Sequence, residues 1–327
     1  MKLYDDQYVV ITGGAGFIGS NVIKRLNDEG FTSIIIVDDL GTSEKWKNLV
    51  GKKFEGIVSR YEIFDWLKGR ESEIEAFIHL GACSSTVERD ADYLYTNNTL
   101  FSQQLCEYAL ENGHRFIYAS SAATYGNGEQ GFSDDPSGLQ ALSPLNMYGF
   151  SKHLFDLWLQ KHGLLNKVTG LKYFNVFGPN EYHKGRMASA IVHFTRQIAE
   201  KGAVKLFKSS EPDKFEDGGQ LRDFVYVKDV AKITADLLKK DVFGIYNMGT
   251  GTPHTWLELA NGVFKGLKLP PKIEFVDMPE DLVGKYQNYT AADMGRFEGE
   301  FGSIAWTPFE ESVIEYVEDY LVKEEVN

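Results

Sequence analysis

A glycine-rich turn between an apolar segment and an amphipathic segment limits most strongly what this chain can fold into. Residues 12–19 read Thr-Gly-Gly-Ala-Gly-Phe-Ile-Gly and contain the spacing Gly-x-Gly-x-x-Gly. Residues 8–12 before the turn are typical of a β-strand, and apolar residues between 18 and 26 recur at helical spacing. Such glycines permit a tight turn and let a pyrophosphate approach the backbone at the N-terminus of the helix. The segment predicts a dinucleotide-binding βαβ unit.

Short β-branched runs alternate with helical patterns through the first half of the chain. Besides residues 8–12, we expect strands at 33–37, 76–80 and 115–119. Parallel strands need crossover connections, which are usually helices, so the alternation predicts a parallel sheet covered on both faces. The predicted fold class is α/β, a Rossmann-type doubly wound parallel sheet with a smaller mixed α/β substrate domain.

The regular alternation stops after a further expected strand at 171–176, where Phe-Gly-Pro follows. We place a domain change there, and we expect residues 224–227 to form a strand that returns to the sheet. The predicted domains are a dinucleotide-binding domain of residues 1–174, rejoined by about 224–250 and 295–327, and a substrate domain of about 175–223 and 251–294.

The C-terminal segment carries a helix-start pattern. Residues 307–310 read Thr-Pro-Phe-Glu, which matches a capping box with proline at the first helical position. Apolar residues at Val313, Val317, Tyr320 and Leu321 follow at helical spacing. We expect a terminal amphipathic helix capped by Thr307.

Composition excludes several classes of protein. The formal net charge of -13 opposes long-range attraction to phosphate, so we expect no nucleic acid as a partner. No apolar run reaches the ~20 residues that a membrane-spanning helix needs, and the first residues lack the pattern of a signal peptide. Two cysteines, Cys83 and Cys106, are too few for a disulfide framework. We expect a soluble cytoplasmic protein with no membrane partner.

The residues after the second expected strand bear on which dinucleotide binds. Asp38 follows the glycine turn at the ~20-residue spacing expected for a carboxylate that binds ribose, which favours a free 2′-hydroxyl and therefore NAD. Lys45 could neutralise a 2′-phosphate, which favours NADP, or could be a solvated surface lysine beside Glu44 and Lys47. The residues themselves leave both cofactors open.

A second motif indicates redox chemistry. Tyr148 and Lys152 are four residues apart, so on a helix they share one face. The ammonium group could lower the phenol pKa, normally near ~10, and reach the cofactor ribose. Ser121, at the end of an expected strand, could donate to an oxygen that becomes a carbonyl. Tyr-x-x-x-Lys is common by chance, but together with the glycine turn and this serine it indicates a nicotinamide-dependent enzyme.

These motifs resemble the extended short-chain dehydrogenase/reductase family over essentially the whole chain, with added support from residues 120–126 and 222–230. Within that family, further motifs are most similar to those of the ADP-heptose 6-epimerases. They lie at residues 81–86, 173–176, 183–185, 187–189 and 285–287. The resemblance implies NADP as cofactor, an ADP-sugar as substrate, and epimerisation through transient oxidation to a ketone. We also expect a homo-oligomer.

The resemblance also implies roles for individual residues. It assigns catalysis to Tyr148 and Lys184, with Lys152 and Ser121 beside them. It implies cofactor contacts from Gly13, Gly16, Phe17, Ile18, Gly19, Asp38, Asp39, Lys45, Leu80, Gly81, Ala82, Cys83, Ser84, Asn97, Lys152, Val176 and Lys184. It implies substrate contacts from Ser121, Asn175, Arg186, His193, Phe207, Lys208, Ser209, Ser210, Arg222 and Tyr286.

The sequence departs from the family pattern in three places. Arg186 replaces the small residue expected after Lys-Gly, residues 57–60 lack the acidic residue that commonly meets adenine, and residues 211–220 form a longer segment than usual. We expect no metal site, because the histidines lack ligand spacing. His79, on an apolar strand, is expected to be a hydrogen-bonded core residue.

Three alternative functions share part of the pattern. A UDP-hexose 4-epimerase has the same glycine turn and Tyr-x-x-x-Lys, but residues 81–86 and 183–189 disfavour it. A 4,6-dehydratase would need an acidic pair where residues 122–123 are both alanine. A non-catalytic dinucleotide-binding regulator would not need to keep Tyr148 and Lys152.

Overall fold

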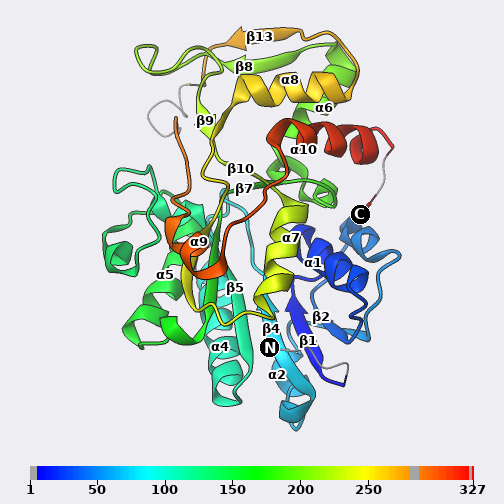
Figure 1. Ribbon diagram of the computed structural model, residues 1–327, viewed down its shortest axis with the longest axis vertical. Helices are drawn as coiled ribbons and strands as arrows, with labels where there is room; N and C mark the ends of the chain where they lie inside the picture. The colour runs from blue at the N-terminus through cyan, green and yellow to red at the C-terminus, as the bar shows by residue number, and fades with distance from the viewer. Residues whose placement is uncertain (1–5, 280–286, 324–325) are drawn as a thin grey trace.

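A parallel sheet forms the centre of the computed structural model, which describes residues 6–279, 287–323 and 326–327 (Figure 1). Its strands are β1 (Tyr8–Thr12), β2 (Ile34–Val37), β3 (Gly56–Val58), β4 (Ile74–His79), β5 (Arg115–Ser121), β6 (Thr169–Tyr173) and β11 (Gly244–Met248). They pair in the order β11-β6-β5-β4-β1-β2-β3, and every pair is parallel. The predicted Rossmann-type α/β fold is confirmed.

Helices cover both faces of this sheet, because strand side chains that point to opposite faces are both apolar. One face packs against α1 (Phe17–Asp28), α7 (Val227–Leu237) and α9 (Gly295–Phe301). The other face packs against α2 (Ile63–Trp66), α4 (Phe101–Glu111) and α5 (Met147–Lys161). Neighbouring residues of β1 show the alternation: Val9 belongs to the first layer and Val10 to the second.

A smaller mixed α/β region lies beyond the carboxyl ends of the central strands, at the top of Figure 1. Its helices are α6 (Ala190–Lys201), α8 (Trp256–Gly266) and α10 (Phe309–Glu315). Its strands form three pairs, β7 (Asn175–Phe177) with β10 (Phe224–Tyr226), β8 (Val204–Phe207) with β13 (Ile273–Val276), and β9 (Leu221–Arg222) with β12 (His254–Thr255). The three helices and the strands β7, β8, β10 and β13 share a third apolar core. The predicted domain bounds stay a prediction, and α10, which they group with the sheet, packs against α8.

Two strand expectations differ from the structure. The run at 171–176 is divided at Phe174, whose backbone N–H donates to Met248 O (3.1 Å), so β6 stays in the central sheet and β7 leaves it. The expectation that 224–227 returns to the central sheet is wrong, since β10 pairs with β7. The returning strand is β11, which pairs with β6. Hydrophobic pattern identifies a strand but does not identify its partner.

The predicted cap of the terminal helix is also wrong, although the amphipathic helix itself is confirmed by the buried Val313 and Val317. Thr307 donates from its backbone N and its Oγ1 to the carboxylate of Asp229 on α7, both at 2.9 Å. The helix then begins at Phe309. A capping box stands instead at the start of α8, where Thr255 Oγ1 accepts from Glu258 N (3.0 Å) and Glu258 Oε2 accepts from Thr255 N (2.7 Å).

Within residues 6–279, 287–323 and 326–327, no helix combines the length and the apolar composition needed to cross a membrane.

Candidate active site

A cavity of about 610 Å³ opens where the strand order reverses between β1 and β4. In open α/β sheets, ligands bind in this crevice, outside the carboxyl ends of the strands. Its lining includes residues that directly follow β1, β2 and β4, and the last residues of β5. The fold therefore places the glycine turn and the strand-end serine in one site.

The glycine turn is close-packed in a way that side chains would prevent. A Cβ on Gly13 would lie 2.8 Å from the Cα of Gly81, and a Cβ on Gly19 would lie 2.3 Å from Gly13 O. Gly13 also has a φ of 68°, which favours glycine. Next to this turn, α1 begins at Phe17 with its N-terminus at the cavity. The turn and the helix N-terminus fit the pyrophosphate of a dinucleotide.

Every residue predicted to contact the cofactor lines this cavity. At one end, the Asp38 carboxylate accepts hydrogen bonds from Ala15 N (2.9 Å), Asp39 N (2.8 Å) and Lys45 Nζ (2.7 Å). Lys45 is therefore an ion-paired residue of the cavity, with 19% of its side chain exposed, and not a solvated surface lysine. A carboxylate and an ammonium group together face the position expected for the adenosine ribose.

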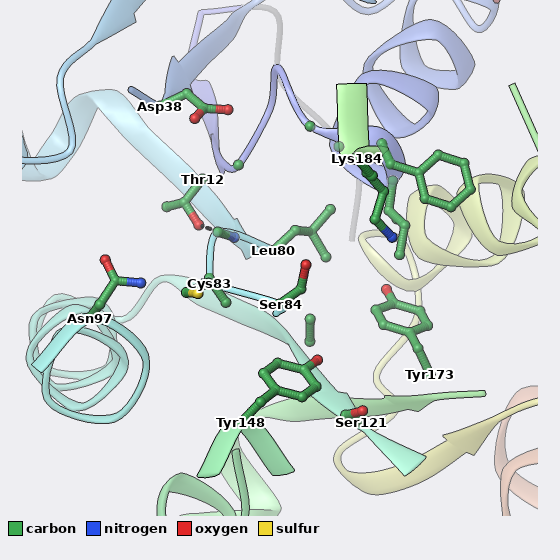
Figure 2. Close-up of a pocket in the computed structure, with 18 of the residues that line it drawn as sticks. Thr12, Asp38, Leu80, Cys83, Ser84, Asn97, Ser121, Tyr148, Tyr173 and Lys184 are labelled. Carbon is green, nitrogen blue, oxygen red and sulfur yellow. Dashed lines mark hydrogen bonds between the residues drawn. The ribbon is translucent and has the colours of Figure 1, made fainter. Parts of the chain in front are cut away.

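One wall of the cavity carries Tyr148 and Ser121 (Figure 2). Lys152 lines the cavity with them. Asn146 caps α5 by accepting from Gly149 N (2.8 Å), which sets where the helix begins. Tyr148 lies beside Ser121, which acts on the pKa of its phenol, and the Lys152 ammonium group donates to Ala119 O (2.9 Å). The helix and β5 thereby hold the three side chains together.

Burial has the largest effect on the ionisation of this wall. It raises the pKa of Tyr148, and Ser121 opposes that rise. Burial lowers the pKa of Lys152 to about 8, while Asp156 raises it. Burial dominates the pKa of Tyr148 and the Lys152 ammonium group donates to Ala119 O, so the lowering of the phenol pKa by Lys152 stays a prediction.

The facing wall is a short 3₁₀ segment, η7 (Tyr182–Met187), which carries Lys184. Figure 2 shows the Lys184 amine and the Tyr148 hydroxyl directed into the same space from different sides. Lys184 Nζ lies 5.3 Å from the ring centroid of Phe17. Burial lowers the pKa of Lys184, and Glu181 opposes this. Both groups can exchange protons with a ligand between them.

Several cavity residues were not among those predicted. Arg60 follows β3 and lines the cavity, in the segment 57–60 that lacks an acidic residue. Its guanidinium donates to Asn97 Oδ1. His183 also lines the cavity, and burial, Lys184 and Lys45 lower its pKa to about 4. The signal that could have found Arg60 is its place after the strand next to β2, because neighbouring parallel strands end at one edge.

Of the predicted substrate residues, Ser121 lines the cavity. The others that the structure describes do not line it: Asn175, Arg186, His193, Phe207, Lys208, Ser209, Ser210 and Arg222. Arg222 lies in β9 over the Trp256 ring, with 5.7 Å to the centroid. Lys208 is ion-paired with Asp277 (2.9 Å). Tyr286 lies outside the described residues, and the substrate roles stay predictions.

Comparison with known proteins identifies the family. The model of the NAD dependent epimerase/dehydratase family matches residues 9–249. The chain belongs to this family. It is 49% identical over 315 residues to the ADP-L-glycero-D-manno-heptose-6-epimerase of Nitratidesulfovibrio vulgaris strain Hildenborough, covering 95% of this chain and 97% of that relative.

Two further relatives of this epimerase/dehydratase chain bear the same name. The Fusobacterium nucleatum protein is 44% identical over 329 residues, covering 97% of this chain and 99% of its own. The crystal structure of the Helicobacter pylori protein superimposes with a TM-score of 0.80 at 28% identity, covering 98% of this chain and 96% of that one. Similarity therefore extends across both the sheet and the smaller region.

The prediction for His79 is confirmed in this epimerase/dehydratase chain. Its Nδ1 lies 2.6 Å from Thr12 Oγ1, and its Nε2 lies 2.8 Å from Ser102 Oγ. Burial lowers the pKa of His79 to about 3, so the ring stays neutral and links β4 to β1 beneath the cavity. In the part of the chain that the structure describes, no three His, Cys, Asp or Glu residues gather into a metal-binding group.

Proposed function

We propose that this chain is an NADP-dependent epimerase that converts ADP-D-glycero-D-manno-heptose to ADP-L-glycero-D-manno-heptose, inverting carbon 6 of the heptose. The observation that carries the proposal is the placement of Tyr148 and Lys184 on two walls of one dinucleotide-type cavity. An epimerase must handle a proton while the reacting carbon presents either face. Relatives that match nearly the whole chain and bear the name of this enzyme support the same substrate.

The glycine turn, Asp38 and the residues after β4 would hold the dinucleotide. The bound dinucleotide would supply a hydride acceptor that also returns the hydride, so that no net oxidation of the sugar results. The remaining work belongs to protein side chains that bind the sugar hydroxyl, remove its proton and return it.

Tyr148 or Lys184 removes the proton of the sugar hydroxyl as the carbon is oxidised, which leaves a ketone. Ser121 donates a hydrogen bond to the oxygen of that ketone. The sugar then presents its other face, and the second of the two residues returns a proton to the oxygen as the carbon is reduced. Lys152 places a positive charge beside Tyr148, which favours the phenolate that forms during the reaction. The adenosine diphosphate, bound away from the reacting carbon, anchors the substrate while the sugar reorients.

The proposal includes NADP in preference to NAD, a cytoplasmic location and a homo-oligomeric assembly. The ion-paired Lys45 at the ribose end of the cavity supports NADP. The free thiols of Cys83 and Cys106 support a reducing compartment. Exposed apolar side chains such as Leu145 and Phe150 near the start of α5 support an interface with a second copy. Light scattering of the purified protein measures the subunit number.

Mass spectrometry of the nucleotide that co-purifies with the protein, followed by an epimerisation assay on ADP-heptose, tests the function. We expect NADP to be released and the two heptose isomers to interconvert. Turnover of UDP-hexose with no turnover of ADP-heptose would instead identify a 4-epimerase. Dinucleotide binding without any turnover would identify a regulator.

A further inference from the structure

Beneath the catalytic wall lies a fully buried ion pair that the mechanism above does not use. We propose that Asp156 and Lys172 are positioning residues of this enzyme, which hold Ser121 and the Lys152 ammonium group in place for catalysis. The inference rests on the proposed function in one respect: it takes Tyr148, Lys152 and Ser121 as the catalytic wall.

Asp156 on α5 collects hydrogen bonds from the strand that carries Ser121. Lys172 Nζ, from β6, lies 2.7 Å from Asp156 Oδ2, and neither side chain is exposed to solvent. Tyr118 OH donates to Asp156 Oδ1 (2.9 Å) and Ser120 Oγ donates to Asp156 Oδ2 (2.7 Å). The carboxylate thereby ties α5 to two positions of β5 and one of β6.

Lys172 reaches Ser121 through one intermediate side chain. Its Nζ donates to Thr124 Oγ1 (2.8 Å), and Thr124 Oγ1 in turn donates to the backbone carbonyl of Ser121 (2.8 Å). Thr124 has a single hydroxyl hydrogen, so donation to Ser121 leaves its oxygen to accept from Lys172. This chain of hydrogen bonds fixes the strand end whose serine contacts Tyr148.

Asp156 also acts on Lys152, one helical turn away on the same face of α5. Lys152 Nζ donates to Ala119 O, between the two β5 residues that donate to Asp156. Lys152 also interacts with His79 on β4, and the titratable groups around Asp156 are Tyr118 on β5, His153 on α5 and Lys172 on β6. None of these four carries a negative charge in its ordinary state, whereas Asp156 raises the pKa of Lys152 against the effect of burial.

Stability alone explains this ion pair poorly. Removing charges from water costs free energy that a buried pair often fails to recover, and apolar replacements of similar volume are often neutral or stabilising. A pair that contacts Thr124 and Ser120, next to the catalytic serine, has a role that apolar side chains could not supply.

The test follows the alkaline limb of two pH profiles, kcat/KM for ADP-heptose and the Kd of NADPH. The variants are Asp156→Asn and the double variant Asp156→Asn with Lys172→Met. The double variant removes both buried charges, and it is used if the single variant, which leaves Lys172 unpaired, fails to fold. Asp156→Glu is the conservative variant that keeps the charge.

A matched control removes a second acid–base pair of the chain by the same chemistry, Asp134→Asn with Arg296→Met. That pair joins at 3.0 Å, and Asp134 Oδ2 accepts from Asn247 N of β11 (2.8 Å). Melting curves of all variants are recorded beside the profiles. The control measures what the loss of a packed ion pair does when Asp156 is intact.

We expect the alkaline limb of both profiles to move roughly 1 to 3 pH units lower in Asp156→Asn, because Lys152 loses its opposite charge and becomes neutral at lower pH. In the double variant the limb should also move lower, but by less, because the positive charge of Lys172 is removed as well. Asp156→Glu and the control should keep the parent limb. The pKa of Lys184 should not change in these variants, since the acidic group that acts on it is Glu181 and not Asp156. An unchanged limb in the Asp156→Asn variants, with losses of activity and melting temperature like those of the control, would overturn the proposal. If the parent protein does not epimerise ADP-heptose, the proposed function fails, while the NADPH profile still tests Asp156.

Discussion

The cofactor half and the substrate half of the site are built in different ways. The cofactor half gathers turns that follow neighbouring parallel strands, and every residue predicted for it lines one cavity. The substrate half depends on short strand pairs such as β9 with β12, whose members are far apart in the sequence, and among its predicted described residues only Ser121 lines that cavity. The cofactor half is a property of the sheet, whereas the substrate half is a property of how the smaller region packs on it.

The two halves meet at Tyr148 and Lys184, where the largest effect is expected. Tyr148→Phe should lower kcat by ~100-fold to 10,000-fold, because it removes an acid/base group. Its Kd for NADPH should stay near that of the parent, since Tyr148 supplies none of the glycine-turn contacts. Steady-state kinetics, NADPH titration and a melting curve check this. Near-normal turnover would mean that Lys184 carries the proton transfer alone.

Lys184→Met should also lower kcat for epimerisation by ~100-fold or more, because one of the two acid/base groups is lost. The assay starts from each purified isomer and follows nicotinamide absorbance in parallel. The parent should interconvert the isomers without net change in absorbance, since each hydride removed is returned. Accumulation of reduced cofactor with a ketone product would indicate a dehydrogenase. Normal turnover of Lys184→Met would exclude the two-base assignment and leave the epimerase in place.

Within the cofactor half, Lys45→Ala should weaken NADP more than NAD. A charge-assisted hydrogen bond contributes roughly 1.5–3 kcal/mol, which is on the order of a tenfold or greater change in affinity. The ion pair of Lys45 with Asp38 places the ammonium group at the ribose end of the cavity. Titration of both cofactors into the parent and the variant measures the difference. Equal affinities of the parent for NADP and NAD would show that Lys45 does not select between the two cofactors.

Within the substrate half, Arg222→Met should raise KM for ADP-heptose by roughly tenfold, the effect of losing one charged contact. The Kd of NADPH should not change, because Arg222 does not line the cofactor cavity. Kinetics and NADPH titration on the same preparation separate the two effects. A weakened NADPH affinity would show that the two halves are not independent.

The smallest expected effect is on stability. Thr255→Ala removes the side-chain cap of α8 and should lower the free energy of unfolding by about 1 kcal/mol. Denaturant unfolding measures this, with NADPH affinity as the control. A change in NADPH affinity would again couple the substrate half to the cofactor half.

Local sequence could predict much of the cofactor half. A Cβ on Gly19 would meet backbone atoms of its own turn, so the need for glycine there can be seen in consecutive residues, whereas a Cβ on Gly13 would meet Gly81, after β4. Tyr148 and Lys152 share a helix face because of their spacing alone. The substrate half could not be predicted in the same way, since β9 is held by β12 and by Asn288 O, which accepts from Leu221 N.

The failures have one physical cause. Thr307 has the spacing of a capping residue, yet the carboxylate of Asp229, 78 residues earlier in the chain, takes both of its donors. The apolar run of β10 is typical of a strand, but its pairing with β7 depends on packing in the smaller region. Hydrogen-bond and strand partners that are distant in the sequence compete with local ones, and the spacing of residues along the chain does not reveal them.

The sequence by itself determined the Rossmann-type sheet, the glycine turn and the Tyr148–Lys152 pair, because steric and helical constraints act between near neighbours. The tertiary structure alone decided that Lys45 pairs with Asp38, that Arg60 lines the cavity, and that Lys184 faces Tyr148. It also placed Lys172 against Asp156 beneath the catalytic wall. These contacts depend on where strands end relative to one another, and that order is set by pairing across the whole sheet.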